Sequence, residues 1–243
     1  MNARPEGRKL AVRNILGRLR SLGSRRNVLG MARFGITSRK VFGVGATRLR
    51  MLAKKIGRNP ELSLRLWNTG YLEARIIAAL IGDPVRVTRA QMNRWAKDFD
   101  NWAVCDSCCG ILFDKTPFAY EKAVFWSKRK KEFVRRAGFV LMAELAVHDK
   151  RAPDAAFIRF FPHIRRGATD DRNAVRKAVN WAVRQIGKRN IALHGKAIRL
   201  ARDIRTIDSR AARWIASDAL RELTNPKIRG RIRRSSTRGI GGA

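Results

Sequence analysis

The chain has 243 residues, 45% of them hydrophobic, so it is long and apolar enough to bury a full core. Its 54 Lys and Arg against 19 Asp and Glu give a formal net charge of +35, which predicts binding to a polyanion, with nucleic acid as the leading candidate. No apolar stretch is long enough for a membrane span, and residues 1–30 lack the apolar core of a secretory signal.

The sequence therefore predicts a cytoplasmic protein, associated with the nucleoid through DNA and with no membrane contact. The Arg-rich, nearly acid-free start of the chain has two readings, an organellar transit peptide or a folded basic helix.

Apolar residues recur at helical spacing along the chain, and no segment shows the alternation of a strand. Turn signals lie at Asn59–Pro60, Gly82–Asp83–Pro84, Thr116–Pro117 and Ala152–Pro153. The predicted fold is all-α, with helices over residues 8–22, 24–34, 46–58, 60–68, 70–82, 88–98, 102–113, 117–130, 131–147, 153–165, 171–188, 190–204 and 209–223.

Three apolar helices carry embedded basic residues, at Arg75, Arg136 and Lys177, and the helix with Asp106 lies midway between the first two. Equivalent helices that recur every 30–40 residues or so are typical of stacked α-hairpins. We expect a HEAT-like solenoid of antiparallel helix pairs, folded as a single domain over residues 1–225. Its second helices would line a basic concave groove containing these four residues and one of Arg210 and Arg213.

Asp106 is the one carboxylate in the nearly apolar segment 102–113. On a helix it shares a face with Trp102, at positions i and i+4. Because desolvating a carboxylate costs several kcal/mol, Asp106 is either held in a structural network or kept for chemistry on a cationic ligand.

The three cysteines, Cys105, Cys108 and Cys109, are too few for the disulfide framework of a secreted domain. Their Cys-x-x-Cys spacing lacks an upstream His-x-Glu, since the first histidine is His148, so we expect buried thiols, no metal site and no cofactor. In His148–Asp149–Lys150, adjacent residues do not face one another on a helix, so a structural role is expected.

These features resemble the AlkD-like DNA alkylation repair glycosylases, HEAT-repeat proteins that excise alkylated purines. The resemblance spans most of the chain. It is carried by Phe42–Gly43–Val44–Gly45 with Leu49–Lys54, Glu73–Ala74–Arg75, Trp102-x-x-x-Asp106, Arg136–Ala137 and Val179–Asn180–Trp181–Ala182–Val183–Arg184.

The resemblance implies a cleft framed by Trp102 and Trp181, with Asp106 between them as the catalytic carboxylate. It also implies a phosphate contact from Arg136, to which Arg75, Lys177 and Arg184 are added as further DNA-binding candidates. The chain departs from some members at Ala103, where they have an acidic residue, and at Phe34, where they have tyrosine.

The chemistry fits these residue types. An alkylated purine already carries positive charge and leaves easily, while a carboxylate in a cleft stabilises the oxocarbenium-like sugar. Indole faces attract a cationic base.

We therefore expect a monofunctional glycosylase without metal, acting as a monomer on double-stranded DNA. It would release N3-methyladenine and N7-methylguanine and leave an abasic site. The alternatives are a non-catalytic AlkD-like protein that binds branched or distorted DNA, and an RNA- or protein-binding scaffold. Residues 226–243 are basic and contain Gly, Ser and Pro, which predicts a disordered tail.

Overall fold

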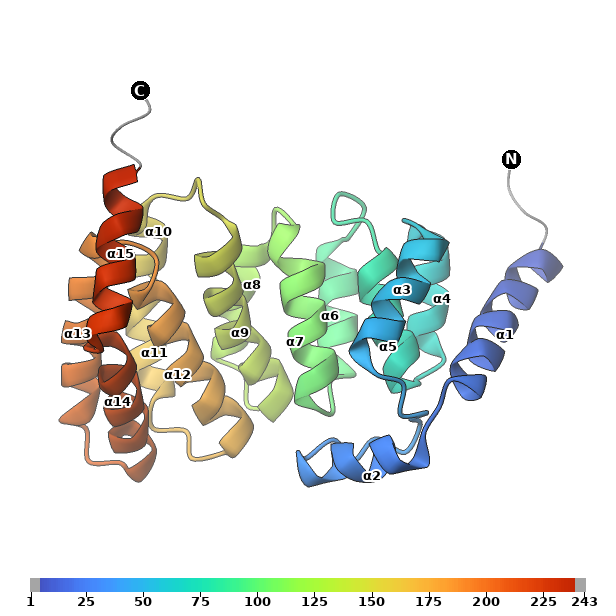
Figure 1. Cartoon of the computed structure of the whole chain (residues 1–243), viewed down its shortest axis with the longest axis horizontal. Helices are drawn as coiled ribbons and strands as arrows, with labels where there is room; N and C mark the ends of the chain where they lie inside the picture. The colour runs from blue at the N-terminus through green and yellow to red at the C-terminus, as the bar shows by residue number, and fades with distance from the viewer. Residues whose placement is uncertain (1–4, 239–243) are drawn as a thin grey trace. The chain divides into compact units, whose positions relative to one another are not determined.

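The computed structural model describes residues 5–238, with side chains from residue 11 to residue 234. Within this range the protein contains fifteen α-helices, one short 3-10 helix and no strand, which confirms the all-α prediction (Figure 1). The chain divides into two compact units, Met1–Pro117 and Phe118–Ala243, and each is described by itself below. The single domain over residues 1–225 stays a prediction.

Unit 1 is built around α5, which packs against α3, α4 and α7. Its core is aromatic: the rings of Trp67 and Trp95 stack with centroids 4.0 Å apart, and Phe99 meets Trp67 edge-on. The helices are α1 (Pro5–Ser21), α2 (Arg25–Arg33), α3 (Ala46–Ile56), α4 (Pro60–Asn68), α5 (Leu72–Ile81), α6 (Arg89–Lys97) and α7 (Trp102–Ile111), followed by η1 (Phe113–Lys115).

A buried carboxylate fixes the loop before α3. Glu73, in the first turn of α5, is fully buried, and its Oε1 accepts hydrogen bonds from the backbone N–H groups of Phe42, Gly43 and Val44 at 3.0, 2.6 and 3.1 Å. Gly43 has a φ of +81°, and a Cβ there would lie 2.3 Å from the carbonyl oxygen of Ser24. Glu73 and the 42–44 loop both belong to segments that carry the family resemblance, and these hydrogen bonds hold the two segments together.

Unit 2 is a stack in which α9 packs against α8 and α12, and α12 against α14. The crossing of α8 and α9 is close at Gly138, where a Cβ would lie 2.3 Å from the backbone nitrogen of Ser127. The helices are α8 (Ala119–Ser127), α9 (Glu132–His148), α10 (Asp154–Ile158), α11 (Phe161–Gly167), α12 (Asn173–Gly187), α13 (Ile191–Arg205), α14 (Arg210–Leu223) and α15 (Pro226–Arg238).

Helices α9, α12 and α14 run parallel. Arg136 near the start of α9 contacts the Ala174 carbonyl at the start of α12, whereas Arg189 just after α12 contacts the Ala146 carbonyl at the end of α9. In the same way α12 meets α14 first through Arg176 and Trp214 and later through Arg184 and Glu222. Within unit 2 the second helices of successive pairs therefore stack in register, as the predicted repeat requires.

The structure corrects the prediction in two places. The helix expected over 153–165 is two helices, α10 and α11, because Pro162 has no N–H to continue the first helix and instead occupies the first turn of the second. The tail expected to be disordered from residue 226 is helical as far as Arg238, and residues 239–243 lie outside the described residues.

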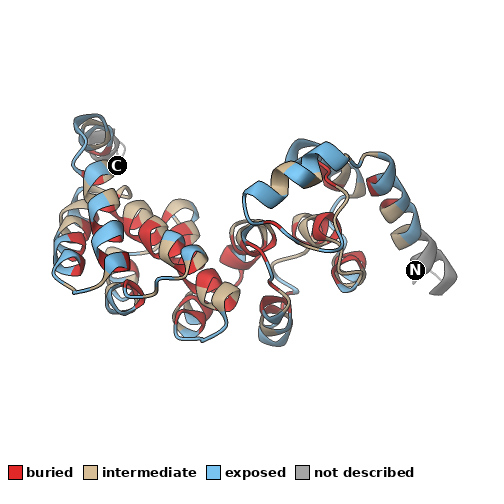
Figure 2. Ribbon diagram, turned by 90° about the horizontal axis from the view of Figure 1, so that it is seen from below, coloured by how far each residue is buried: buried red, intermediate tan, exposed pale blue. Residues whose placement is uncertain are grey.

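In both units the helices turn their buried residues toward their neighbours (Figure 2). None of the helices within the described residues combines the length and hydrophobicity that a membrane crossing requires.

Candidate active site

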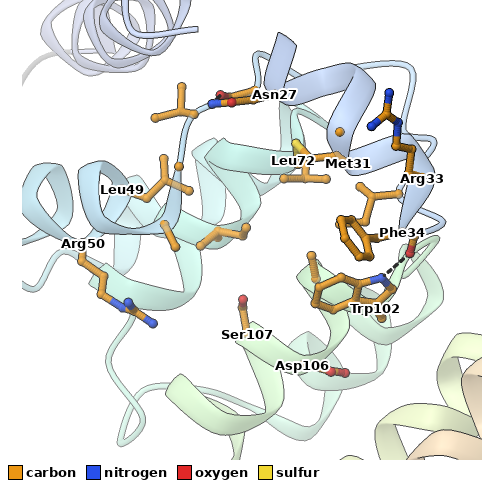
Figure 3. A pocket seen from close by; sticks show the side chains of 18 of the residues that line it. Asn27, Met31, Arg33, Phe34, Leu49, Arg50, Leu72, Trp102, Asp106 and Ser107 are labelled. Atoms are coloured by element: carbon orange, nitrogen blue, oxygen red, sulfur yellow. Dashed lines mark hydrogen bonds between the residues drawn. The ribbon is translucent and has the colours of Figure 1, made fainter. Parts of the chain in front are cut away.

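A cavity of about 1060 Å³ lies within unit 1, between α2, α3, α5 and α7 (Figure 3). Its walls are mainly apolar, and Trp102 and Asp106 of α7 both line it. The apolar lining includes Leu29, Met31, Ile36, Leu49, Leu72, Ile76 and Leu80. Two of the predicted cleft residues therefore share one cavity, whereas Trp181, the second tryptophan predicted to frame the cleft, does not line it.

The start of α7 is held by a polar network around Asn101, which is 1% exposed. The Asn101 side-chain oxygen accepts from the N–H of Val104 and so caps the helix. Its amide nitrogen donates to Ser38 Oγ at 3.0 Å and to Asp100 Oδ1 at 2.6 Å. These contacts fix where the first turn of α7, and with it Trp102, stands relative to the loop before α3.

Trp102 is 38% exposed, and its indole Nε1 donates a hydrogen bond of 2.9 Å to the carbonyl oxygen of Phe34. The bond ties α7 to the end of α2 and holds the indole at the cavity (Figure 3). Phe34 itself is 73% exposed. A ring face held in this way at an open cavity suits contact with a flat, cationic ligand.

Asp106 follows one helical turn after Trp102 and is partly buried. Arg26, Arg33 and Arg50 are exposed and also line the cavity, so walls that contain one carboxylate contain three arginines as well. This combination offers a site for a developing positive charge inside a rim that attracts phosphate.

Sequence reasoning missed these three arginines and the part played by Asn101. Arg26 and Arg33 belong to α2, which has no buried residue and yet faces the cavity with Leu29 and Met31. For Arg26 and Arg33, the sequence signal was the helical spacing of apolar residues within a basic segment. For Asn101, the signal was its position directly before a predicted helix.

Arg75, for which the sequence predicts a DNA contact, makes its contacts in this structure within unit 1. Its side chain is 15% exposed, and its Nη1 donates to the carbonyl oxygen of Asp98 at 3.1 Å. The guanidinium also lies over the ring of Trp67, with its carbon 5.1 Å from the centroid. These contacts hold the α5 side of the core and leave little of the side chain for phosphate.

In unit 2, Arg136 is 7% exposed and donates to the Ala174 carbonyl at 2.5 Å. Arg184 donates to Glu222 at 2.5 Å and lies 3.8 Å from Asp218. Burial raises the pKa of Glu222, but the hydrogen bond from Lys188 and the charge of Arg184 outweigh it and hold that pKa below the usual value. Both arginines link α12 to a neighbouring helix.

Lys177 is exposed, and Trp181, one turn later on α12, is partly buried. Their spacing leaves both on one face of the helix, so unit 2 does present a cation and an indole together. That these residues meet Trp102 and Asp106 in one groove stays a prediction.

The three cysteines are all buried. Burial raises the pKa of Cys108 and Cys109 well above the usual value, and the neighbouring Cys105 adds to the effect. Among the described residues no group of three or more His, Cys, Asp and Glu is arranged to hold a metal ion.

We expect no fast-reacting thiol in the folded protein, since a buried, protonated sulfur is a poor nucleophile. Titration with a thiol-reactive disulfide at pH 8 should give a negligible early phase, followed by three equivalents in denaturant. A rapid equivalent in the native protein would contradict the buried positions.

The chain matches a family model described as DNA alkylation repair enzyme over residues 15–223. Among solved structures it is similar to a member of a family related to the HEAT-like repeat DNA glycosylases and described as having affinity for branched DNA structures. The TM-score is 0.71 at 20% identity, covering 87% of this chain and 95% of that one. A designed armadillo repeat protein in complex with a (KR)4 peptide gives a TM-score of 0.39 at 14% identity, with 78% and 80% covered. No curated protein matches the chain.

Proposed function

Because the chain belongs to the family of DNA alkylation repair enzymes, we propose that it is a monofunctional glycosylase for cationic alkylated purines, N3-methyladenine and N7-methylguanine. Membership of the family confirms the resemblance seen in the sequence, and the first solved structure above confirms the HEAT-like fold. The observation that carries the proposal is the cavity of unit 1, which is lined by Asp106, by Trp102 with its indole anchored to Phe34, and by three arginines.

The proposed reaction is hydrolysis of the N-glycosidic bond. The bond electrons go to the cationic purine, which leaves as a neutral base, and C1′ of the deoxyribose gains positive charge. The Asp106 carboxylate stabilises that charge and orients a water, whose oxygen bonds to C1′ and whose proton passes by way of the carboxylate to solvent. An abasic site remains.

The Trp102 face would contribute by holding the cationic base, which is worth about 0.5–2 kcal/mol in cation–π interactions. Arg26, Arg33 and Arg50 would hold backbone phosphates with charge-assisted hydrogen bonds. In unit 2 we keep Lys177 as a phosphate contact and Trp181 as a second indole for the base. Arg75, Arg136 and Arg184 are left with the structural contacts described above. The partner is double-stranded DNA, bound by a monomer.

We expect the purified protein to release N3-methyladenine and N7-methylguanine from methylated duplex DNA at neutral pH, and to leave hypoxanthine in place. Hypoxanthine is neutral and needs protonation by a general acid, and the lining of the cavity offers no second carboxylate beside Asp106. Chromatography of the free bases measures the release of each of the three purines. A chelator in a parallel reaction should have no effect. Efficient release of hypoxanthine, or loss of methylpurine release with the chelator, would contradict this mechanism.

A second candidate is a protein that binds branched DNA without excision, because the similar solved structure is described as having that affinity. The two candidates give opposite results in the assay above. A non-catalytic binder would release no base from methylated duplex and would bind a four-way junction more tightly than a linear duplex of the same length.

A further inference from the structure

Helix α15 is docked onto unit 2 by a narrow apolar stripe. Ile232 is 3% exposed, Ile228 one turn earlier is partly buried, and the helix packs against α13 and α14. The helix follows the last residue that the family model matches, residue 223. It therefore lies outside the segment that the family model matches.

All five cations of α15 whose side chains are described are exposed: Lys227, Arg229, Arg231, Arg233 and Arg234. The helix contains no Asp or Glu. With 3.6 residues per turn, Lys227, Arg231 and Arg234 follow one flank of the isoleucine stripe, while Arg229 and Arg233 follow the other. The docking stripe thus holds two rows of cations at fixed positions on either side of it.

Such an arrangement opposes the folding of the helix. Like charges at i and i+4, as in Lys227–Arg231 and Arg229–Arg233, repel each other and destabilise a helix. A polyanion that lies along the helix removes this repulsion. Duplex DNA carries a phosphate every 3.4 Å or so along each strand, which is dense enough to serve both rows at once.

We propose that α15 is a second DNA-binding element, which contacts backbone phosphates of duplex DNA without regard to sequence or damage. The choice of DNA as the polyanion rests on the proposed function. The contact itself needs neither an alkylated base nor the cavity of unit 1, so it persists even in a protein that excises nothing.

The test compares two triple variants that remove the same charge from unit 2. One is Arg229→Gln, Arg231→Gln and Arg233→Gln in α15. The control is Arg199→Gln, Arg202→Gln and Arg205→Gln, which removes three exposed arginines of α13. Glutamine keeps the helix propensity. Deletion of α15 is avoided because it would uncover the surface that Ile232 covers.

The measurement is the affinity for undamaged duplex DNA as a function of salt. Each lost phosphate contact lowers the slope of log K against log salt by about 0.9, so the α15 variant should lose about two to three units of slope. The control should lose less than about one. Equal losses in the two variants, or no loss in either, would overturn the proposal.

If the first variant melts earlier than the parent, it is replaced by a double variant of the two remaining cations, Lys227→Gln with Arg234→Gln, with an expected loss of about two units of slope. Anionic phospholipid vesicles and single-stranded RNA serve as competing polyanions. A variant that loses affinity for either of these but keeps its affinity for duplex DNA would also refute the assignment. Because the measurement uses undamaged duplex DNA, it can be interpreted even if the parent protein excises no base.

Discussion

Asp106→Asn should lower the single-turnover rate of methylpurine release by about a hundredfold, while the affinity for DNA stays equal or rises. The substitution keeps the shape of the side chain in the cavity but removes the charge that would stabilise the sugar in the transition state. A loss of about 3 kcal/mol of such stabilisation corresponds to that factor. The affinity is spared because the lost carboxylate repels phosphate. Free-base release at saturating protein, together with a binding curve on the same duplex, measures both effects.

Asp83→Asn is the matched control, since Asp83 also belongs to unit 1 but lies outside the cavity lining and pairs with Arg58 at 3.6 Å. This variant should excise at the rate of the parent. Excision by Asp106→Asn within about threefold of the parent would remove the carboxylate from the mechanism.

Glu73→Ala should destabilise unit 1 by about 3 kcal/mol or more. It leaves the part-buried N–H group of Phe42 and the buried N–H groups of Gly43 and Val44 without their carboxylate acceptor. An unsatisfied buried donor costs about 1–3 kcal/mol, and water entering the space left by the side chain would compensate only in part. The melting temperature should fall by about 6–12 °C in a thermal unfolding experiment.

Glu61→Ala gives the comparison for this prediction. Glu61 also occupies the first turn of a helix in unit 1, but it is exposed and reaches Arg65 at 3.4 Å across one turn. An exposed pair of this kind contributes at most about 1 kcal/mol. Similar melting temperatures for the two variants would show that the hydrogen bonds between the 42–44 loop and Glu73 add little to stability.

The helices could be predicted because their signals are local. Asn59, Asn101, Asn190 and Ser209 each cap the helix that follows, through a side chain that accepts from a backbone N–H three residues later. The split at Pro162 and the helix after Pro226 escaped prediction for opposite reasons. The first is a break inside an apolar pattern, whereas the second is an ordered element inside a composition typical of disorder.

Ile228 and Ile232 are the only described apolar side chains of α15, and nothing in the composition of residues 226–243 marks them as an anchor. What orders the helix is the surface of α13 and α14 beneath it, which the sequence of the tail does not contain.

The candidate site was predictable only where chemistry was unusual for its surroundings. Asp106 in an apolar helix is such a case, and the structure does place it at a cavity. The recurrence of basic residues in successive apolar helices was a weaker guide. Arg75 and Arg136 occur at similar places because each spans the gap to a neighbouring element and donates to a carbonyl there. A sequence shows that such a charge is embedded in an apolar helix, but it does not show whether the charge faces another helix or the solvent.

Because α9, α12 and α14 run parallel, their helix dipoles add to a net dipole within unit 2. Peptide dipoles add along each helix to about half a positive charge at its start and half a negative charge at its end, and in three parallel helices these ends lie at the same two edges. The first turns of α12 and α14 contain no acidic residue to offset the positive end. The edge where these helices begin therefore has a positive backbone potential, which is offset in α9 by Glu132 of its first turn and, before α12, by Asp170, a carboxylate that Arg135 and Arg172 neutralise in turn.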